Sequence, residues 1–214
     1  TLNGLSRGGT GKGKYWSANS STNSYMSFGA PTGLTNNTSD SWAYCGWWRP
    51  NFEVDDTSNS GILWALNDGD WSPTGQIGVR IGQGNGFRVH SGSTSQMLNT
   101  GLPSATYTDK WVFFCIWHRL SGGRYAGQGF ATDTNLTDHA TDTTSSSTST
   151  GNGYNMIIGA RPDDLPEDIP DGTRIGTQAA WFGGGDSFVT TSEGWSEART
   201  KFEAIFDATK ARYT

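Results

Sequence analysis

The chain has 214 residues, including 30 glycines and ten tryptophans, and its formal net charge is −5. Single all-β domains often have this length, and the tryptophans supply the large apolar area that a core needs. Basic residues are scattered apart from a weak cluster at Arg7, Lys12 and Lys14. This distribution argues against a nucleic-acid-binding face, and no apolar run is long enough for membrane insertion.

The N-terminal segment has a polar, Gly-rich composition. Residues 1–24 are rich in Gly and Ser, which predicts an arm with a first strand, followed by one domain over residues 25–214. Residues 15–28 alternate weakly between apolar and polar side chains and predict an edge strand.

Residues 41–49 give a stronger strand pattern, which Pro50 ends. Side chains of a strand point alternately to its two faces. The alternation predicts one face with Trp42, Tyr44 and Trp48 and another with Ala43, Cys45 and Trp47. Further along, residues 61–66 are a short apolar run, and residues 76–81 and 87–90 predict a β-hairpin around a Gly-rich turn.

Residues 110–118 are apolar on both faces, a pattern typical of a central strand that is covered on both sides. Residues 123–132 and 154–160 predict two more strands, and residues 179–182 with 188–189 the last strand material. Residues 138–153 are polar and rich in Ser and Thr, so we expect a long exposed loop there.

The final segment, residues 195–213, predicts an amphipathic helix. Its apolar side chains recur at helical spacing: Trp195, Ala198, Phe202, Ile205, Phe206 and Ala208.

The two cysteines, Cys45 and Cys115, both lie in apolar strand patterns. Buried free thiols, in a protein made in the cytosol, are the favoured interpretation. A disulfide across adjacent strands is the alternative, although two cysteines do not make a disulfide framework.

The order of several short motifs resembles the concanavalin A-like lectin/glucanase superfamily in its laminin-G-like form. The first motif is WWRP at residues 47–50. The second is a hydrophobic strand that begins with Lys110 and Trp111 and ends at a Gly-containing turn at residues 121–123. The last two are IIG at 157–159 and EAIFDA at 203–208. The resemblance covers roughly Tyr25 to Tyr213 and implies an all-β fold: a two-sheet antiparallel jelly-roll sandwich with a short C-terminal helix. Because this fold hosts lectins, glycosidases, lyases and virion modules, it does not determine the function.

A catalytic centre has little support in the sequence. Glu53 and Asp55 partly match the E-x-D-x-x-E strand of glucanases with this fold, but Ser58 replaces the second Glu. A retaining glycosidase needs two carboxyl groups, so a solvated acidic loop is the favoured interpretation. No catalytic residue is predicted, and His90, His118 and His139 lack metal-ligand spacing.

Two loops are candidates for binding sugar, because an aromatic ring next to carboxylate and amide groups can hold a pyranose. The first loop contains Asp68, Asp70 and Trp71, and the second contains Asn135 and His139. A third, acidic loop is a candidate calcium site, with Asp163, Asp164, Asp168 and Asp171 as oxygen ligands. Its spacing matches no calcium motif, so no cofactor is the favoured prediction and calcium is the alternative.

We therefore expect a non-enzymatic recognition or structural module. The favoured role is that of a bacteriophage virion surface protein, made in the host cytoplasm, that decorates the head or serves in the tail. Its partners would be other virion proteins, cell-surface carbohydrate or further copies of itself in a closed homo-oligomer. The alternatives are a secreted carbohydrate-binding module or lectin and, third, a glycoside hydrolase or polysaccharide lyase.

Overall fold

A computed structural model of the chain describes residues 2–3, 5–9, 13–18, 25–30, 40–50, 61–66, 77–81, 86–91, 94–99, 107–119, 124–142, 155–159, 169, 172–184, 188–189 and 194–214. Its strands form two seven-stranded antiparallel sheets. The first, sheet A, contains in spatial order β1 (Leu2–Asn3), β4 (Tyr25–Ser27), β13 (Met156–Ile158), β6 (Gly61–Leu66), β7 (Ile77–Ile81), β8 (Gly86–Ser91) and β9 (Thr94–Asn99). The second, sheet B, contains β12 (Thr137–Asp142), β11 (Arg124–Phe130), β10 (Val112–Arg119), β5 (Asp40–Arg49), β14 (Arg174–Gly184), β3 (Tyr15–Ala18) and β2 (Leu5–Gly8).

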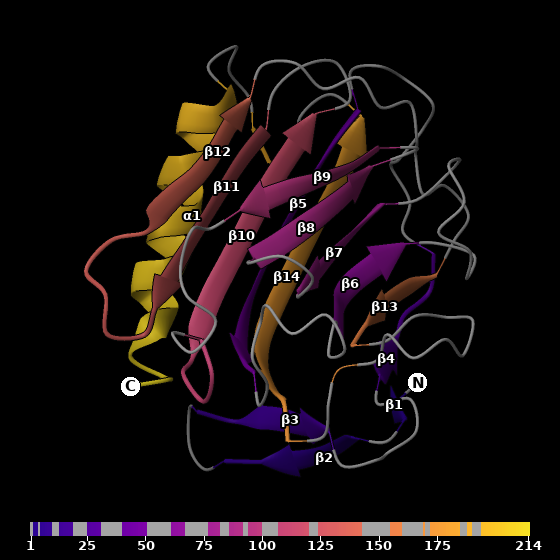
Figure 1. Ribbon diagram of the computed structural model, residues 1–214, viewed down its shortest axis with the longest axis vertical. Helices are drawn as coiled ribbons and strands as arrows, with labels where there is room; N and C mark the ends of the chain where they lie inside the picture. Colours follow the sequence, from indigo (N-terminus) through magenta and orange to yellow (C-terminus); the bar gives the residue numbers. More distant parts are fainter. Residues whose placement is uncertain are drawn as a thin grey trace.

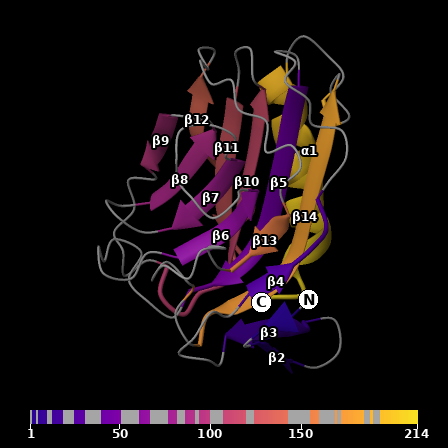
Figure 2. The ribbon, with the colours of Figure 1, turned by 90° about the vertical axis from the view of Figure 1, so that its right-hand side faces the viewer.

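The described elements stack in three layers. Strands β6–β9 of sheet A lie over one face of sheet B, and helix α1 (Gly194–Lys210) covers the other face (Figures 1 and 2). The prediction of an all-β sandwich with one C-terminal helix is therefore confirmed. No helix in the described part of the chain is long and apolar enough to cross a membrane.

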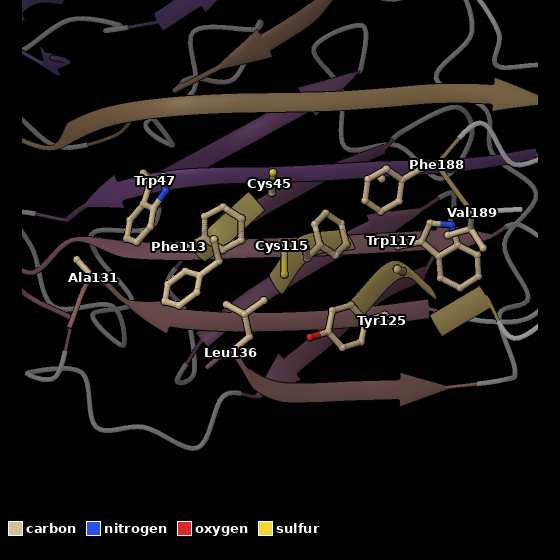
Figure 3. Close-up of a cluster of buried hydrophobic side chains, with 14 of the residues drawn as sticks. Cys45, Trp47, Phe113, Cys115, Trp117, Tyr125, Ala131, Leu136, Phe188 and Val189 are labelled. Carbon is tan, nitrogen blue, oxygen red and sulfur yellow. The ribbon is translucent and has the colours of Figure 1, made fainter. Parts of the chain in front are cut away.

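Sheet B separates two apolar clusters, and the alternation of β5 assigns its side chains to them as predicted. Trp42, Tyr44 and Trp48 belong to the inner cluster, which also includes Met26 and Ile158 of sheet A. Ala43, Cys45 and Trp47 belong to the outer cluster, beneath α1. Figure 3 shows Cys45 and Trp47 in this cluster. The outer cluster also takes Phe202 and Phe206 from the helix.

Strand β10 is central, because it pairs with β5 on one side and β11 on the other. Its inward residues Val112, Phe114 and Ile116 join the inner cluster, and its outward residues Phe113, Cys115 and Trp117 join the outer one. The prediction that this strand is central and covered on both faces is therefore confirmed. The predicted hairpin is also present, since β7 pairs with β8 from Ile77–Ser91 to Ile81–Phe87.

Helix α1 packs closely on sheet B at its first residue. A Cβ atom on Gly194 would overlap the ring of Trp117, so a glycine is required there. The buried helix residues are Gly194, Ala198, Phe202, Phe206 and Thr209. The predicted apolar face was wrong at two positions, because Trp195 is 42% exposed and Ala208 is exposed.

The thiols of Cys45 and Cys115 are free and buried, as favoured from the sequence. The two residues are direct partners across β5 and β10, and Cys115 Sγ lies 3.4 Å from the carbonyl oxygen of Gly127. Burial raises the pKa of both thiols, because the thiolate loses its hydration.

Several local predictions need correction. The single strand expected over residues 15–28 is two strands, β3 and β4, in different sheets. Residues 138–142 lie in β12 and not in a loop, because they pair with β11. Strand β9 was not predicted, and β14 starts earlier than expected, at Arg174. The division at residue 24 stays a prediction, although β2 and β3, both N-terminal to it, extend sheet B.

Candidate functional site

Most of the residues proposed from the sequence lie outside the described part of the chain. This applies to the first predicted sugar loop, with Asp68, Asp70 and Trp71, and to the predicted calcium loop, with Asp163, Asp164, Asp168 and Asp171. Both stay predictions. Within the described residues, no group of three or more His, Cys, Asp or Glu side chains is placed to hold a metal ion.

The second predicted sugar loop is only partly a loop. Asn135 is exposed in the segment before β12, whereas His139 is half-buried within that strand. Burial lowers the pKa of His139, with an opposing effect from the neighbouring Asp138 carboxylate. The Nε2 atom of His139 is buried and finds no hydrogen-bond partner in the described structure. That these two residues bind sugar remains a prediction.

The carboxylate of Asp138 serves to attach α1 to sheet B. The Tyr125 hydroxyl donates to Asp138 Oδ1 at 2.9 Å, and Arg199 Nη1 lies 2.9 Å from Asp138 Oδ2. Arg199 also bonds Glu203 at 3.1 Å, one helical turn further on. Through these contacts the Asp138 carboxylate links β11 and β12 to α1.

A larger opening lies at the end of sheet B where β5 and β11 end and β10 begins. Its volume is about 490 Å³, within the range of small-molecule sites, about 300–1,000 Å³. We call this opening the end cleft. Its lining residues are Arg49, Asp109, Lys110, Trp111, Phe130, Ala131, Thr132, Tyr213 and Thr214. Aromatic rings and charged side chains thus meet at one opening.

The aromatic wall of the end cleft is held in place by β14. The Tyr213 ring lies 4.6 Å from Trp111 and 4.8 Å from Trp47, between ring centroids. Its hydroxyl accepts a hydrogen bond from the Thr177 backbone N–H at 2.6 Å and shares another with Thr177 Oγ1 at 2.8 Å. The pairing of β14 shifts register at this point, and a Cβ atom on Gly176 would come within 2.6 Å of the hydroxyl. The irregularity in β14 therefore makes room for Tyr213.

Trp111 is half-buried at the centre of this wall. Its ring also contacts Tyr15 of β3, at 5.8 Å between centroids. A partly exposed indole ring fixed by its neighbours is suited to pack against an apolar ligand face.

The charged wall is built around Asp109, whose φ of 58° lies in the left-handed region. Non-glycine residues seldom adopt this conformation, and it occurs often at binding sites. Three interactions maintain it: the Asp109 N–H donates to the Pro50 carbonyl at 2.8 Å, Arg49 Nε donates to the Asp109 carbonyl at 2.8 Å, and Arg49 Nη2 lies 3.5 Å from Asp109 Oδ1. The Asp109 side chain remains 64% exposed, so its carboxylate can accept hydrogen bonds from a ligand.

Two more cations lie at or beside the end cleft. Lys110 Nζ is 5.7 Å from the centre of the Phe130 ring. The Arg174 guanidinium, which is not part of the lining, is 4.9 Å from the centre of the Tyr15 ring. Both contacts are in the range of cation–π interactions.

The lining is chemically suited to binding. Asp109 is its one acidic side chain among the described residues, whereas glycoside hydrolysis by the usual mechanism uses a pair of carboxyl groups. An aromatic ring, a carboxylate and N–H donors can instead hold a polar ligand that has an apolar face.

Sequence reasoning missed this site because it assigned Trp111 to the covered central strand predicted over residues 110–118. One signal was available: Trp111 directly follows Asp109 and Lys110, so the strand begins at a charged segment. A tryptophan between a charged segment and an apolar strand lies at the edge of the core, where its ring is only partly buried.

A second hollow is smaller and less suited to a polar ligand. It measures about 130 Å³, and its lining residues are Phe28, Tyr44, Met156, Ile158, Gln178, Ala179 and Ala180. It lacks charged side chains among these residues, so the end cleft is the better candidate.

The sequence matches no family model and no curated protein. Solved structures do resemble the fold. A GH54 α-L-arabinofuranosidase has a TM-score of 0.63 and 10% identity, over 94% of this chain and 41% of that one. The binding domain of Paraclostridial Mosquitocidal Protein 1 has a TM-score of 0.61 and 13% identity, over 97% and 46%.

A third structure is domain 4 of AbnA, a GH43 extracellular arabinanase from Geobacillus stearothermophilus, in complex with arabinotriose. Its TM-score is 0.54 at 15% identity, over 85% of this chain and 76% of that one. The chain spans less than half of the arabinofuranosidase and of the mosquitocidal binding domain. At these identities the likeness establishes a shared β-rich fold, found both in binding domains and in glycosidases.

Proposed function

We propose that this domain is a non-enzymatic glycan-binding module and that the end cleft is its binding site. The observation that carries the proposal is the half-buried Trp111 ring beside the exposed Asp109 carboxylate in an opening of about 490 Å³. We also propose that the sandwich is of the concanavalin A-like, laminin-G-like kind that its sequence motifs resemble.

The chemistry of the end cleft supports a sugar ligand. The C–H groups on one face of a pyranose can pack against the Trp111 ring, while its hydroxyl groups donate to Asp109 and accept from Arg49 or Lys110. The fold comparison adds independent support, because one similar structure is described as a complex with arabinotriose and another as a binding domain.

A glycan array on the purified protein tests the proposal, with Trp111→Ala and Asp109→Asn as site variants. We expect each to weaken glycan binding at least tenfold. Trp195→Ala is the matched control, because it removes an exposed indole at the other end of α1 and should leave binding unchanged.

Trp111 also contacts Tyr213, so thermal unfolding must show that the Trp111→Ala protein is folded. Asp109→Asn keeps the aromatic wall and makes the test independent of that contact. If both variants bind as the parent does while Trp71→Ala loses binding, the site lies in the loop predicted from the sequence and the proposal for the end cleft is wrong.

The non-enzymatic part of the proposal has its own test. Reducing-sugar release from every glycan that binds should stay at background. If release occurs and Glu53→Gln abolishes it, the alternative of a glycosidase or lyase is correct. Glu53 lies outside the described residues.

A role on a bacteriophage virion stays a prediction, because the similar structures give it no support. Calcium dependence likewise stays a prediction, and it is tested by repeating the array after chelation. Stable association of the domain with virus particles would favour the virion role, whereas glycan binding by the isolated domain would favour the glycan-binding module.

A further inference from the structure

Positive charge gathers at and beside the end cleft in a chain whose net charge is −5. Arg49 ends β5, Lys110 precedes β10, and Arg174 begins β14. These residues are far apart in sequence, so the cluster is produced by the pairing of β5 with both β10 and β14.

Arg49 and Arg174 stand directly opposite each other in the β5–β14 pair. Like charges at directly opposed positions of an antiparallel pair destabilise the sheet. Natural proteins tend to keep such local conflicts where function requires them.

Nearby acidic groups balance this charge only in part. Asp109 is 3.5 Å from Arg49, and its side chain is 64% exposed. Among the described residues, no carboxylate lies within ion-pair distance of Arg174 or Lys110, whose charged groups lie over the rings of Tyr15 and Phe130. In the described part of the chain, Asp109 is thus the one carboxylate within ion-pair distance of any of these three cations.

We propose that the natural ligand of the end cleft is an anionic glycan, one that carries carboxylate or sulfate groups. This inference rests on the proposed function and adds the ligand class. Arginine binds carboxylate and sulfate oxygens through paired N–H donors, and a bound anion would offset the like charges that Arg49 and Arg174 bring to paired positions of β5 and β14. Trp111 would hold the sugar ring beside that anion.

The experiment compares the best acidic glycan from the array with its uncharged counterpart: the methyl ester of a uronate oligosaccharide, or the desulfated form of a sulfated one. We expect the acidic form to bind at least tenfold more tightly in low salt and to lose most of this advantage at high salt. Arg174→Gln, which lies beside the lining, should remove most of the preference while neutral glycans still bind. Arg49→Gln should also remove most of the preference, but it should weaken neutral glycans as well, because Arg49 lines the end cleft and holds Asp109.

Arg7→Gln is the matched control. Arg7 is exposed on the edge strand β2 and pairs with Trp16, whose side chain packs against the inner cluster. Its side chain therefore belongs to the opposite face of sheet B from Arg49. This variant removes the same charge and should leave the preference intact.

A second readout does not depend on finding a glycan. Sodium sulfate and sodium glucuronate should raise the thermal midpoint of the parent more than sodium chloride at equal ionic strength, and this difference should shrink in Arg49→Gln and Arg174→Gln but not in Arg7→Gln.

The outcomes separate the two proposals. If Trp111→Ala abolishes binding but acidic and neutral glycans bind equally, the end cleft is a glycan site and the anionic preference is wrong. If no glycan binds while the anion effect on stability follows Arg49 and Arg174, the anion site stands and the glycan proposal fails. Loss of both signals overturns both, as would tighter binding of a single-stranded oligonucleotide than of any glycan.

Discussion

The outer face of sheet B differs sharply between its centre and its end, although the same strands build both. At the centre, Trp47 and Phe113 lie beneath Phe206 of α1, with ring centroids 5.6 and 5.7 Å away. Two residues closer to the end cleft lie Arg49, the last residue of β5, and Trp111, which directly precedes β10. The helix covers the first pair and ends before the second.

This contrast shows how a binding site can be added to a sandwich without disturbing its core. A covered strand segment needs apolar side chains, and each is packed on all sides. Beyond the helix, the same alternation presents side chains to an opening, where charges and a partly exposed ring are tolerated. Stability is therefore concentrated at the centre and binding at the end.

The largest expected effect comes from opening the centre. Phe202→Ala removes a fully buried ring that lies 4.7 Å from Phe188. The cavity should lower the free energy of unfolding by about 3–5 kcal/mol, measured by urea denaturation. Trp195→Ala, on the same helix but exposed, is the control; a similar loss in both would show that the helix face is assigned wrongly.

An intermediate effect is expected from the two buried thiols as pH rises. Burial raises the pKa of Cys45 and Cys115 in the folded state, whereas the ordinary thiol value is 9.0. The unfolded chain therefore releases these protons first, and stability falls as pH increases through 9.0.

Between pH 8 and about 9.5 the two thiols together should account for a loss of about 1–2 kcal/mol. Urea denaturation at both values measures it, and the double variant Cys45→Ala, Cys115→Ala should show a smaller slope. In the native state neither thiol should react with Ellman's reagent at pH 8; rapid reaction of the folded protein would contradict the sealed centre.

The smallest effect is expected at the end of the face. Arg174→Gln removes the repulsion from Arg49 but also the contact with the Tyr15 ring. These changes oppose each other, so unfolding free energy in low salt should change by less than about 0.5 kcal/mol. A loss above about 1 kcal/mol would assign Arg174 to the fold and weaken its role in binding.

Much of the fold follows from periodicity alone. The alternation in β5, the apolar faces of β10 and the spacing in α1 predict which residues enter which cluster. The prediction fails where polar residues pair. Strand β12 consists of Thr, Asp, His and Ala, and it is a strand because Asp138 and its neighbours bond to β11 and α1.

The end cleft could not be predicted in the same way. Its charged and aromatic residues come from the ends of β5 and β11, the segment before β10 and the segment after α1. Such a site depends on which strand ends coincide, and this is set by the pairing of Val112 with both Trp48 and Phe130. Local sequence shows only that Trp111 follows a charged pair.

The pairing of β10 with β5 and β11 also keeps an aggregation-prone segment covered until the domain unfolds. Strand β10 has six consecutive uncharged residues, Val112–Trp117, with strong β-propensity and no proline. Segments of this kind form cross-β aggregates when exposed. Lys110 on one side and Arg119 on the other provide flanking charges that slow such association. Neighbouring strands and α1 therefore act as a shield against aggregation, and the lifetime of the folded domain depends on how rarely β10 becomes exposed.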